Sequence, residues 1–138
     1  MRRLLSFVLL MFAPVVLAGC GSDSITDPSA SVAGTYSLAS FDGAAPPIVL
    51  LDGDPRIEVV SDVLTLAAAG TFTQRTTFRY TEGGVISSDE QLETGTFTMA
   101  GTTLTLRFTS DGSSQPATVS DKTIVIAVEG HTLRYVRP

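Results

Sequence analysis

Residues 71–81 read TFTQRTTFRYT, and this segment decides the fold class. Its larger and smaller side chains alternate with a period of two, which is typical of a strand with one buried face. No sustained helical stripe follows residue 31, so the domain is predicted to be all-β. The inward face of the 71–81 strand is predicted to carry Phe72, Gln74, Thr76, Phe78 and Tyr80.

Similar alternating runs recur along the chain, separated by turns such as Gly83-Gly84 and Asp111-Gly112. These turns are too short for a helical crossover, so neighbours in sequence are expected to be neighbours in the sheet. This order predicts an antiparallel up-and-down barrel of about eight strands, with a two-sheet β-sandwich as the alternative. The expected strands are 34–41, 56–66, 71–81, 85–99 (bent or split), 102–109, 115–120, 123–129 and 131–137.

The N-terminal segment has the layout of a secretory signal peptide. Arg2 and Arg3 precede an almost wholly apolar run, residues 4–16, and small residues follow before Cys20. The 16 residues from 4 to 19 would span roughly 24 Å as a helix, less than a hydrocarbon core of about 30 Å. An uncleaved membrane helix is therefore the weaker alternative, and residues 1–19 are predicted to be a signal peptide.

The end of this segment, Leu17-Ala18-Gly19-Cys20, resembles the lipobox of bacterial lipoproteins. The resemblance implies that signal peptidase recognises Leu17, Ala18 and Gly19, and that Cys20 becomes lipidated. Lipidation explains a lone cysteine in an exported chain, which has no partner for a disulfide. The implied location is the cell envelope, with the membrane as a partner through the lipid anchor. Because glycine and not aspartate follows Cys20, the resemblance favours the outer membrane, on its periplasmic or surface face.

The charge of the chain argues against two classes of binding partner, nucleic acid and anionic lipid. Without residues 1–19 the chain has 7 basic and 14 acidic residues, a formal net charge of −7. Such a chain lacks the basic patches that bind nucleic acid or anionic lipid. The remaining 119 residues are enough for one domain with a single core. Residues 20–32 are mostly small and polar, so they are predicted to form a flexible tether, followed by a barrel domain over 33–138.

Residues 34–41, GTYSLASF, resemble the first strand of lipocalin-like barrels. In that family a G-x-W motif lays an aromatic ring across the barrel floor, and here Tyr36 takes the place of the tryptophan. The resemblance covers roughly residues 33–138. It implies that an arginine near the end of the chain, Arg134 or Arg137, stacks on this ring.

An eight-stranded barrel can be filled by side chains or can hold one small ligand. The aromatic-rich inner face favours a small apolar ligand, bound in the cell envelope, as the function. The same side chains can instead pack a solid core, and the sequence leaves both possibilities open. The candidate ligand-binding residues are Tyr36, Phe72, Phe78, Tyr80 and Leu106.

Residues 42–55 are predicted to form an irregular loop that holds four consecutive apolar residues, 48–51. They plug a barrel end, cover a ligand as a lid, or present an apolar patch to a protein or a membrane. The last possibility defines the alternative function, an envelope protein–protein interaction module such as an inhibitor or an assembly accessory. A lipoprotein with a purely structural role is a third possibility.

No catalytic or metal-binding pattern emerges from the sequence. His131 is the only histidine, and no G-x-S-x-G motif is present. Asp52 and Asp54 lack the spacing of a calcium loop, and the carboxylates of residues 89–93 are expected in a solvated hairpin. The chain is therefore predicted to be no enzyme and to need no metal or cofactor.

Overall fold

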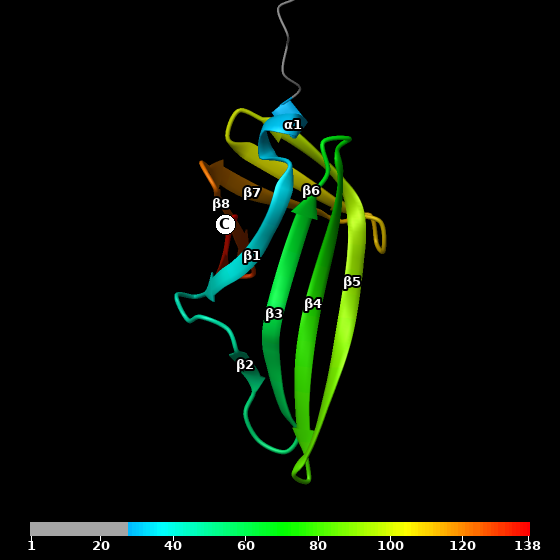
Figure 1. The fold of residues 1–138 in the computed structure, drawn as a ribbon, viewed down its shortest axis with the longest axis vertical. Coiled ribbons are helices and arrows are strands. Elements are labelled where there is room, and N and C mark those ends of the chain that lie inside the picture. Colours follow the sequence, from blue (N-terminus) through cyan, green and yellow to red (C-terminus); the bar gives the residue numbers. More distant parts are fainter. Residues whose placement is uncertain (1–27) are drawn as a thin grey trace, which may run out of the picture.

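The computed structural model describes residues 28–138 (Figure 1). The predicted signal peptide, the lipobox residues Leu17, Ala18 and Gly19, and the predicted lipidation site Cys20 lie outside the described residues. The described chain begins with a short helix, α1 (Pro28–Val32). The strands are β1 (Gly34–Phe41), β2 (Ile48–Leu51), β3 (Arg56–Leu66), β4 (Thr71–Glu82), β5 (Val85–Ala100), β6 (Thr103–Phe108), β7 (Ser114–Ser120), β8 (Thr123–Val128) and β9 (His131–Val136).

All strands belong to one antiparallel sheet that closes on itself. From β3 to β9 each strand pairs with the next, and β1 pairs with both β9 and β3. The closed barrel therefore has eight strands, and β2 is an additional strand beside β3. The predicted all-β up-and-down barrel is confirmed, and the sandwich alternative is wrong.

Alternation along the strands builds the core. Phe72 of β4 lies opposite Leu66 of β3, and Gln74 lies opposite Leu64, so these residues share the inner face as predicted. Within residues 28–138, the core extends from Val32 of α1 to Tyr135 of β9. Because the sheet is closed and has its own core, residues 28–138 form one folding unit.

One end of the barrel is closed by α1 and by the aromatic ring of Tyr36. The Tyr36 hydroxyl donates to the Val32 carbonyl at 2.8 Å, and the Arg137 guanidinium lies 5.5 Å from the centre of the Tyr36 ring. Arg137 also donates to the Ala33 carbonyl at 2.7 Å. A Cβ at Gly34 would lie 2.8 Å from Arg137 Cδ, so glycine makes room for this stacking. Of the two predicted stacking cations, Arg137 is the one in place.

Strands β3, β4 and β5 project beyond the other end of the barrel (Figure 1). β3 pairs with β1 only over residues 63–66 and with β2 over 57–59. β5 pairs with β4 along 85–96 but with β6 only from residue 95 onward. Within the described chain, the β5 backbone before Gly95 therefore has a partner strand on one side only.

The structure differs from the sequence-based expectations in three places. The 42–55 segment contains a strand, β2, because β3 is longer than β1 and leaves an edge on which residues 48–51 can pair. Residues 85–100 form one strand with a continuous register to β4, so the segment is not split, while the expected bend is not contradicted. The last five residues of the expected tether form α1, because Val32 is buried in the core.

Candidate functional site

Two carboxylates of β3, Glu58 and Asp62, are the buried charged residues of the described chain, each only 5% exposed. Four residues apart on a regular strand, they would share one face of the sheet. The register with β4 shifts between Val59 and Ser61, so Val60 is an extra residue, a β-bulge. Asp62 consequently joins Leu64 and Leu66 on the inner face, while Glu58 lies on the outer face.

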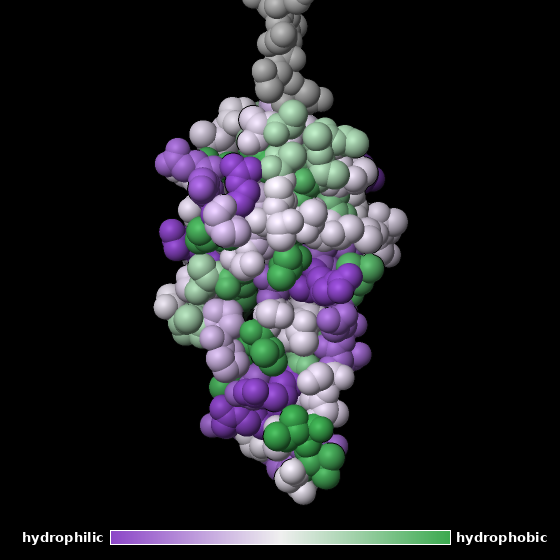
Figure 2. All heavy atoms as spheres, viewed as in Figure 1, coloured by the Kyte–Doolittle hydropathy of each residue, from purple (hydrophilic) through white to green (hydrophobic). Residues whose placement is uncertain are grey.

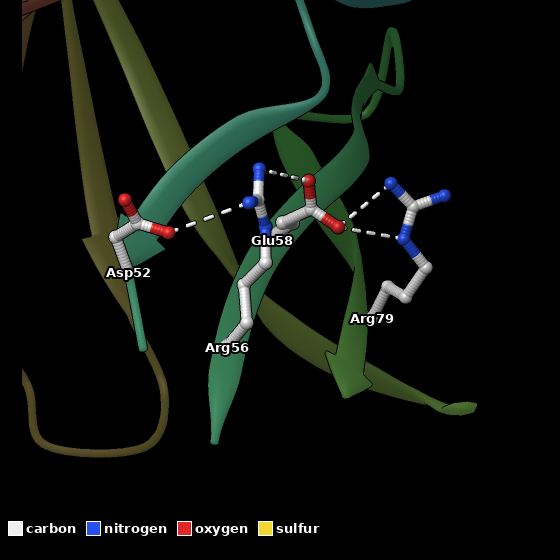
Figure 3. Close-up of polar contacts among 4 residues, drawn as sticks. All are labelled: Asp52, Arg56, Glu58 and Arg79. Carbon is white, nitrogen blue, oxygen red and sulfur yellow. Dashed lines mark hydrogen bonds and ion pairs between the residues drawn. The ribbon is translucent and has the colours of Figure 1, made fainter. Parts of the chain in front are cut away.

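On the outer face, two arginines contact the Glu58 carboxylate (Figure 3). Glu58 Oε2 accepts from Arg79 at 2.7 Å, and Oε1 accepts from Arg56 at 3.2 Å. Arg56 also reaches Asp52 at 3.3 Å. The hydrogen bond from Arg79 holds the pKa of the Glu58 carboxyl below its usual range, because it favours the charged form.

On the inner face, Asp62 has only neutral partners. Its Oδ2 accepts from Gln74 Nε2 and from the Tyr135 hydroxyl, both at 2.8 Å. Gln74 Nε2 also lies 3.1 Å from the Tyr135 hydroxyl, so the three side chains form one cluster. Asp62 Oδ1 is buried and accepts no hydrogen bond of ordinary geometry within residues 28–138, while the hydroxyl of Thr76, opposite Asp62 on β4, also favours the charged carboxyl. Burial raises the pKa of the Asp62 carboxyl, and burial together with the adjacent Asp62 raises the pKa of Tyr135.

A cavity of about 200 Å³ lies beside Asp62 at the open end of the barrel. We call it the Phe78 cavity. Its wall is almost entirely apolar and combines the barrel strands with β2. The lining residues are Leu38, Phe41, Ile48, Leu50, Val59, Asp62, Thr76, Phe78 and Leu133.

A second cavity, of about 290 Å³, lies on the β6–β9 side of the same end. We call it the Phe108 cavity. Gln74 and Tyr135 of the buried cluster contribute to its wall, and Leu133 lines both cavities. Its other lining residues are Phe108, Ser113, Ser114, Gln115, Ile126 and Val128. The open end therefore offers two adjoining recesses with the Asp62 cluster at their boundary.

The predicted ligand-binding residues are divided between core and cavity. Tyr36, Phe72 and Leu106 are almost fully buried members of the packed core and line neither cavity. Phe78 lines the Phe78 cavity, and Tyr80, whose ring centre is 6.3 Å from that of Phe78, follows it along β4 toward the projecting end.

Sequence reasoning missed the polar cluster. The period-two pattern predicts Gln74 on the inner face, but it does not indicate that Asp62 and Tyr135 are its partners. A signal for Asp62 was present, since it alternates in phase with Leu64 and Leu66. A carboxylate in that phase is unusual, because charged residues are rarely fully buried without a partner.

The exposed apolar residues gather on the projecting sheet. In β2, Ile48 is buried whereas Val49, Leu50 and Leu51 are about half exposed. At the β4–β5 turn, Val85 is 71% exposed and Ile86 is 66% exposed. Figure 2 shows apolar surface at this tip, remote from α1.

His131 pairs with an acidic residue at the same end of the barrel. Its Nδ1 lies 2.7 Å from Asp42 Oδ2, while Asp42 Oδ1 accepts from the Thr132 backbone at 2.8 Å. The hydrogen bond with His131 holds the pKa of Asp42 below its usual range. The pair joins the end of β1 to the start of β9.

Residues 28–138 contain no cluster of three or more metal-ligating side chains. In the same part of the chain, no helix is long and apolar enough to span a membrane. No protein-family model, curated protein or solved structure matches the chain. Fold and site together define a small antiparallel β-barrel protein with a two-part cavity at its open end.

Proposed function

We propose that this protein is a lipid-anchored β-barrel of the cell envelope that binds a small, largely apolar ligand at the open end of the barrel. The observation that carries the proposal is the Phe78 cavity, an almost wholly apolar recess with a buried carboxylate in its wall. Concave apolar sites with a few placed polar groups are the usual form of small-molecule sites.

The volumes limit the size of the ligand. The cavities measure about 200 and 290 Å³, at or below the low end of the ~300–1,000 Å³ range of ordinary ligand pockets. An apolar cavity of about 150 Å³ is enough for benzene. The Phe78 cavity alone therefore takes about one ring or a short chain, and a ligand of two or three rings extends from it into the adjoining Phe108 cavity.

The proposed anchor fits the direction of the barrel. β1 runs from Gly34 at the closed end to Phe41 beside the Phe78 cavity. A lipid on Cys20, eight residues before α1, tethers the closed end to the membrane and leaves the open end accessible. The lipobox resemblance supports this envelope location, with the outer membrane favoured, and the lipocalin-like first strand supports a ligand-holding barrel.

Dye binding by residues 28–138 tests the ligand-binding role. N-phenyl-1-naphthylamine, a neutral dye, fluoresces in apolar sites, and we expect saturable binding. Thr76→Phe fills the Phe78 cavity and should weaken dye binding at least tenfold. Thr77→Phe is the matched control on the opposite face of β4 and should leave affinity within about twofold. Absence of dye binding to the wild type, or equal binding by Thr76→Phe with its fold intact, would contradict the proposal.

A second candidate is favoured by the exposed side chains of β2. Val49, Leu50 and Leu51 form a half-exposed apolar strand in the segment expected to contact a protein. This second candidate is an envelope protein–protein interaction module. If it is correct, the double variant Val49→Ser, Leu51→Ser should abolish co-purification of one specific envelope protein and leave thermal stability unchanged. Retention of that protein by the double variant would exclude this surface.

A further inference from the structure

The polar cluster at the open end contains a carboxylate whose charge has no counterpart. Asp62 is 5% exposed, and its Oδ2 accepts hydrogen bonds from the neutral groups of Gln74 and Tyr135. The neutral hydroxyl of Thr76 also favours the charged carboxyl, but Oδ1 accepts no hydrogen bond of ordinary geometry from residues 28–138. A buried carboxylate without a cation is costly, and removing an unpaired acceptor from water adds to that cost. The site is therefore incomplete as it stands.

No cation of the described chain lines either cavity. Arg56 and Arg79 bind Glu58 on the outer face, and Arg75 pairs with Glu90 there. Arg137 stacks on Tyr36 at the closed end. The remaining basic residues, Arg107, Lys122 and Arg134, are exposed.

The charged groups that face the site from the surrounding strands are acidic, apart from the imidazole of His131. On β5, Glu93 lies opposite Gln74 and Asp89 lies opposite Phe78, so both are on the inner face. At the end of β1, Asp42 is paired with His131 of β9. The facing residues of β4, Gln74 and Thr76, and Tyr135 of β9 are neutral donors. The local charge favours a cation and repels an anion.

Building on the proposed function, we propose that the Phe78 cavity binds a small organic ammonium ion, with its apolar group against Phe78 and its ammonium on Asp62 Oδ1. A protonated primary amine supplies both the missing charge and a hydrogen-bond donor. A neutral alcohol supplies only the donor. A metal ion needs several oxygen ligands, whereas the wall of this cavity is almost entirely apolar.

The test compares two probes of nearly equal shape, 2-phenylethylamine and 2-phenylethanol, by calorimetric titration of residues 28–138 at pH 7. The amine should bind at least tenfold more tightly than the alcohol. Asp62→Asn should remove that preference and leave alcohol affinity within about threefold. Thr77→Phe serves again as the control, because it should preserve the amine preference.

A pH series on the wild type provides a test that needs no variant. Affinity for the amine should fall as the solution becomes acidic enough to protonate Asp62, while affinity for the alcohol should stay nearly constant. Equal affinities for the two probes at pH 7, with dye binding intact, would overturn the ammonium proposal and leave the apolar-ligand function standing. Failure of the dye and of both probes to bind would overturn both.

Discussion

Glu58 and Asp62 occupy the same strand and are each only 5% exposed, but they lie on opposite faces of the sheet and have different partners. Two arginines hold Glu58 on the outer face, and its pKa is lowered. Only neutral groups hold Asp62 on the inner face, and its pKa is raised. The comparison teaches that burial alone does not set the role of a carboxylate. Because Glu58 is paired with two arginines, its charge is expected to stabilise the sheet, whereas the charge of Asp62, which has no cationic partner within residues 28–138, is expected to cost stability.

The bulge at Val60 creates this difference, and deletions in β3 test it with the largest expected effect. Removing Val63 shifts the residues just before it by one position, so Asp62 turns outward and leaves the inner-face cluster. We expect the Val63 deletion to abolish the cooperative unfolding transition, which circular dichroism measures. Removing Val60 leaves a regular strand with Glu58 and Asp62 still on opposite faces, and this variant should unfold cooperatively. Equal damage from both deletions would show that the bulge does not set the faces.

Among single substitutions of charged residues, loss of the Arg79–Glu58 ion pair should destabilise the fold the most. Arg79→Leu removes the main partner of Glu58 and leaves that carboxylate covered but poorly paired. Because the folded-state pKa of Glu58 is lowered, its stabilisation is present above the unfolded value of about 4.3 and is lost as the pH falls through the folded value. The melting temperature of Arg79→Leu should therefore fall clearly below wild type at pH 7, and the deficit should narrow near pH 3. A deficit independent of pH would point to lost packing instead.

Neutralising Asp62, the carboxylate without a cationic partner, should stabilise the fold. The folded-state pKa of Asp62 is raised, so the protonated carboxyl stabilises the fold below its unfolded value of about 3.9, and that stability is lost as the pH rises through the folded value. Asp62→Asn should gain about 0.5–2 kcal/mol in the free energy of unfolding at pH 7, the usual range for a stabilising substitution. The gain should disappear near pH 3. Urea unfolding at both pH values measures it, and a loss at pH 7 would mean that the charge itself supports the fold.

An exposed carboxylate supplies the baseline for both effects. Glu90 lies 3.7 Å from Arg75, and both side chains are about 60% exposed. Water screens such pairs, so Glu90→Gln should change the free energy of unfolding by less than about 0.5 kcal/mol at pH 7. A change as large as that of Asp62→Asn would remove the basis for treating burial as decisive.

The fold was predictable because most strands carry a period-two pattern and most turns contain a glycine, the Asp121-Lys122 turn between β7 and β8 being an exception. The resemblance of GTYSLASF to a lipocalin-like first strand implies that Arg134 or Arg137 stacks on Tyr36, and Arg137 is the residue in place. β2 was not predictable, because its pairing depends on the free edge that β3 leaves beyond β1. The same holds for the site: the Asp62 cluster joins residues 73 positions apart and depends on a one-residue bulge, which periodicity does not reveal.

The most direct test of the contrast between the two faces is a carbon-13 NMR titration of the side-chain carboxyls of Asp62 and Glu58 in residues 28–138. The structure predicts a midpoint for Asp62 above the ordinary aspartate value of about 3.9, and a midpoint for Glu58 below the ordinary glutamate value of about 4.3. Addition of 2-phenylethylamine should lower the Asp62 midpoint and leave that of Glu58 unchanged. An Asp62 midpoint at or below 3.9 in the free protein would contradict the account, since the carboxylate would then have its compensating partner already.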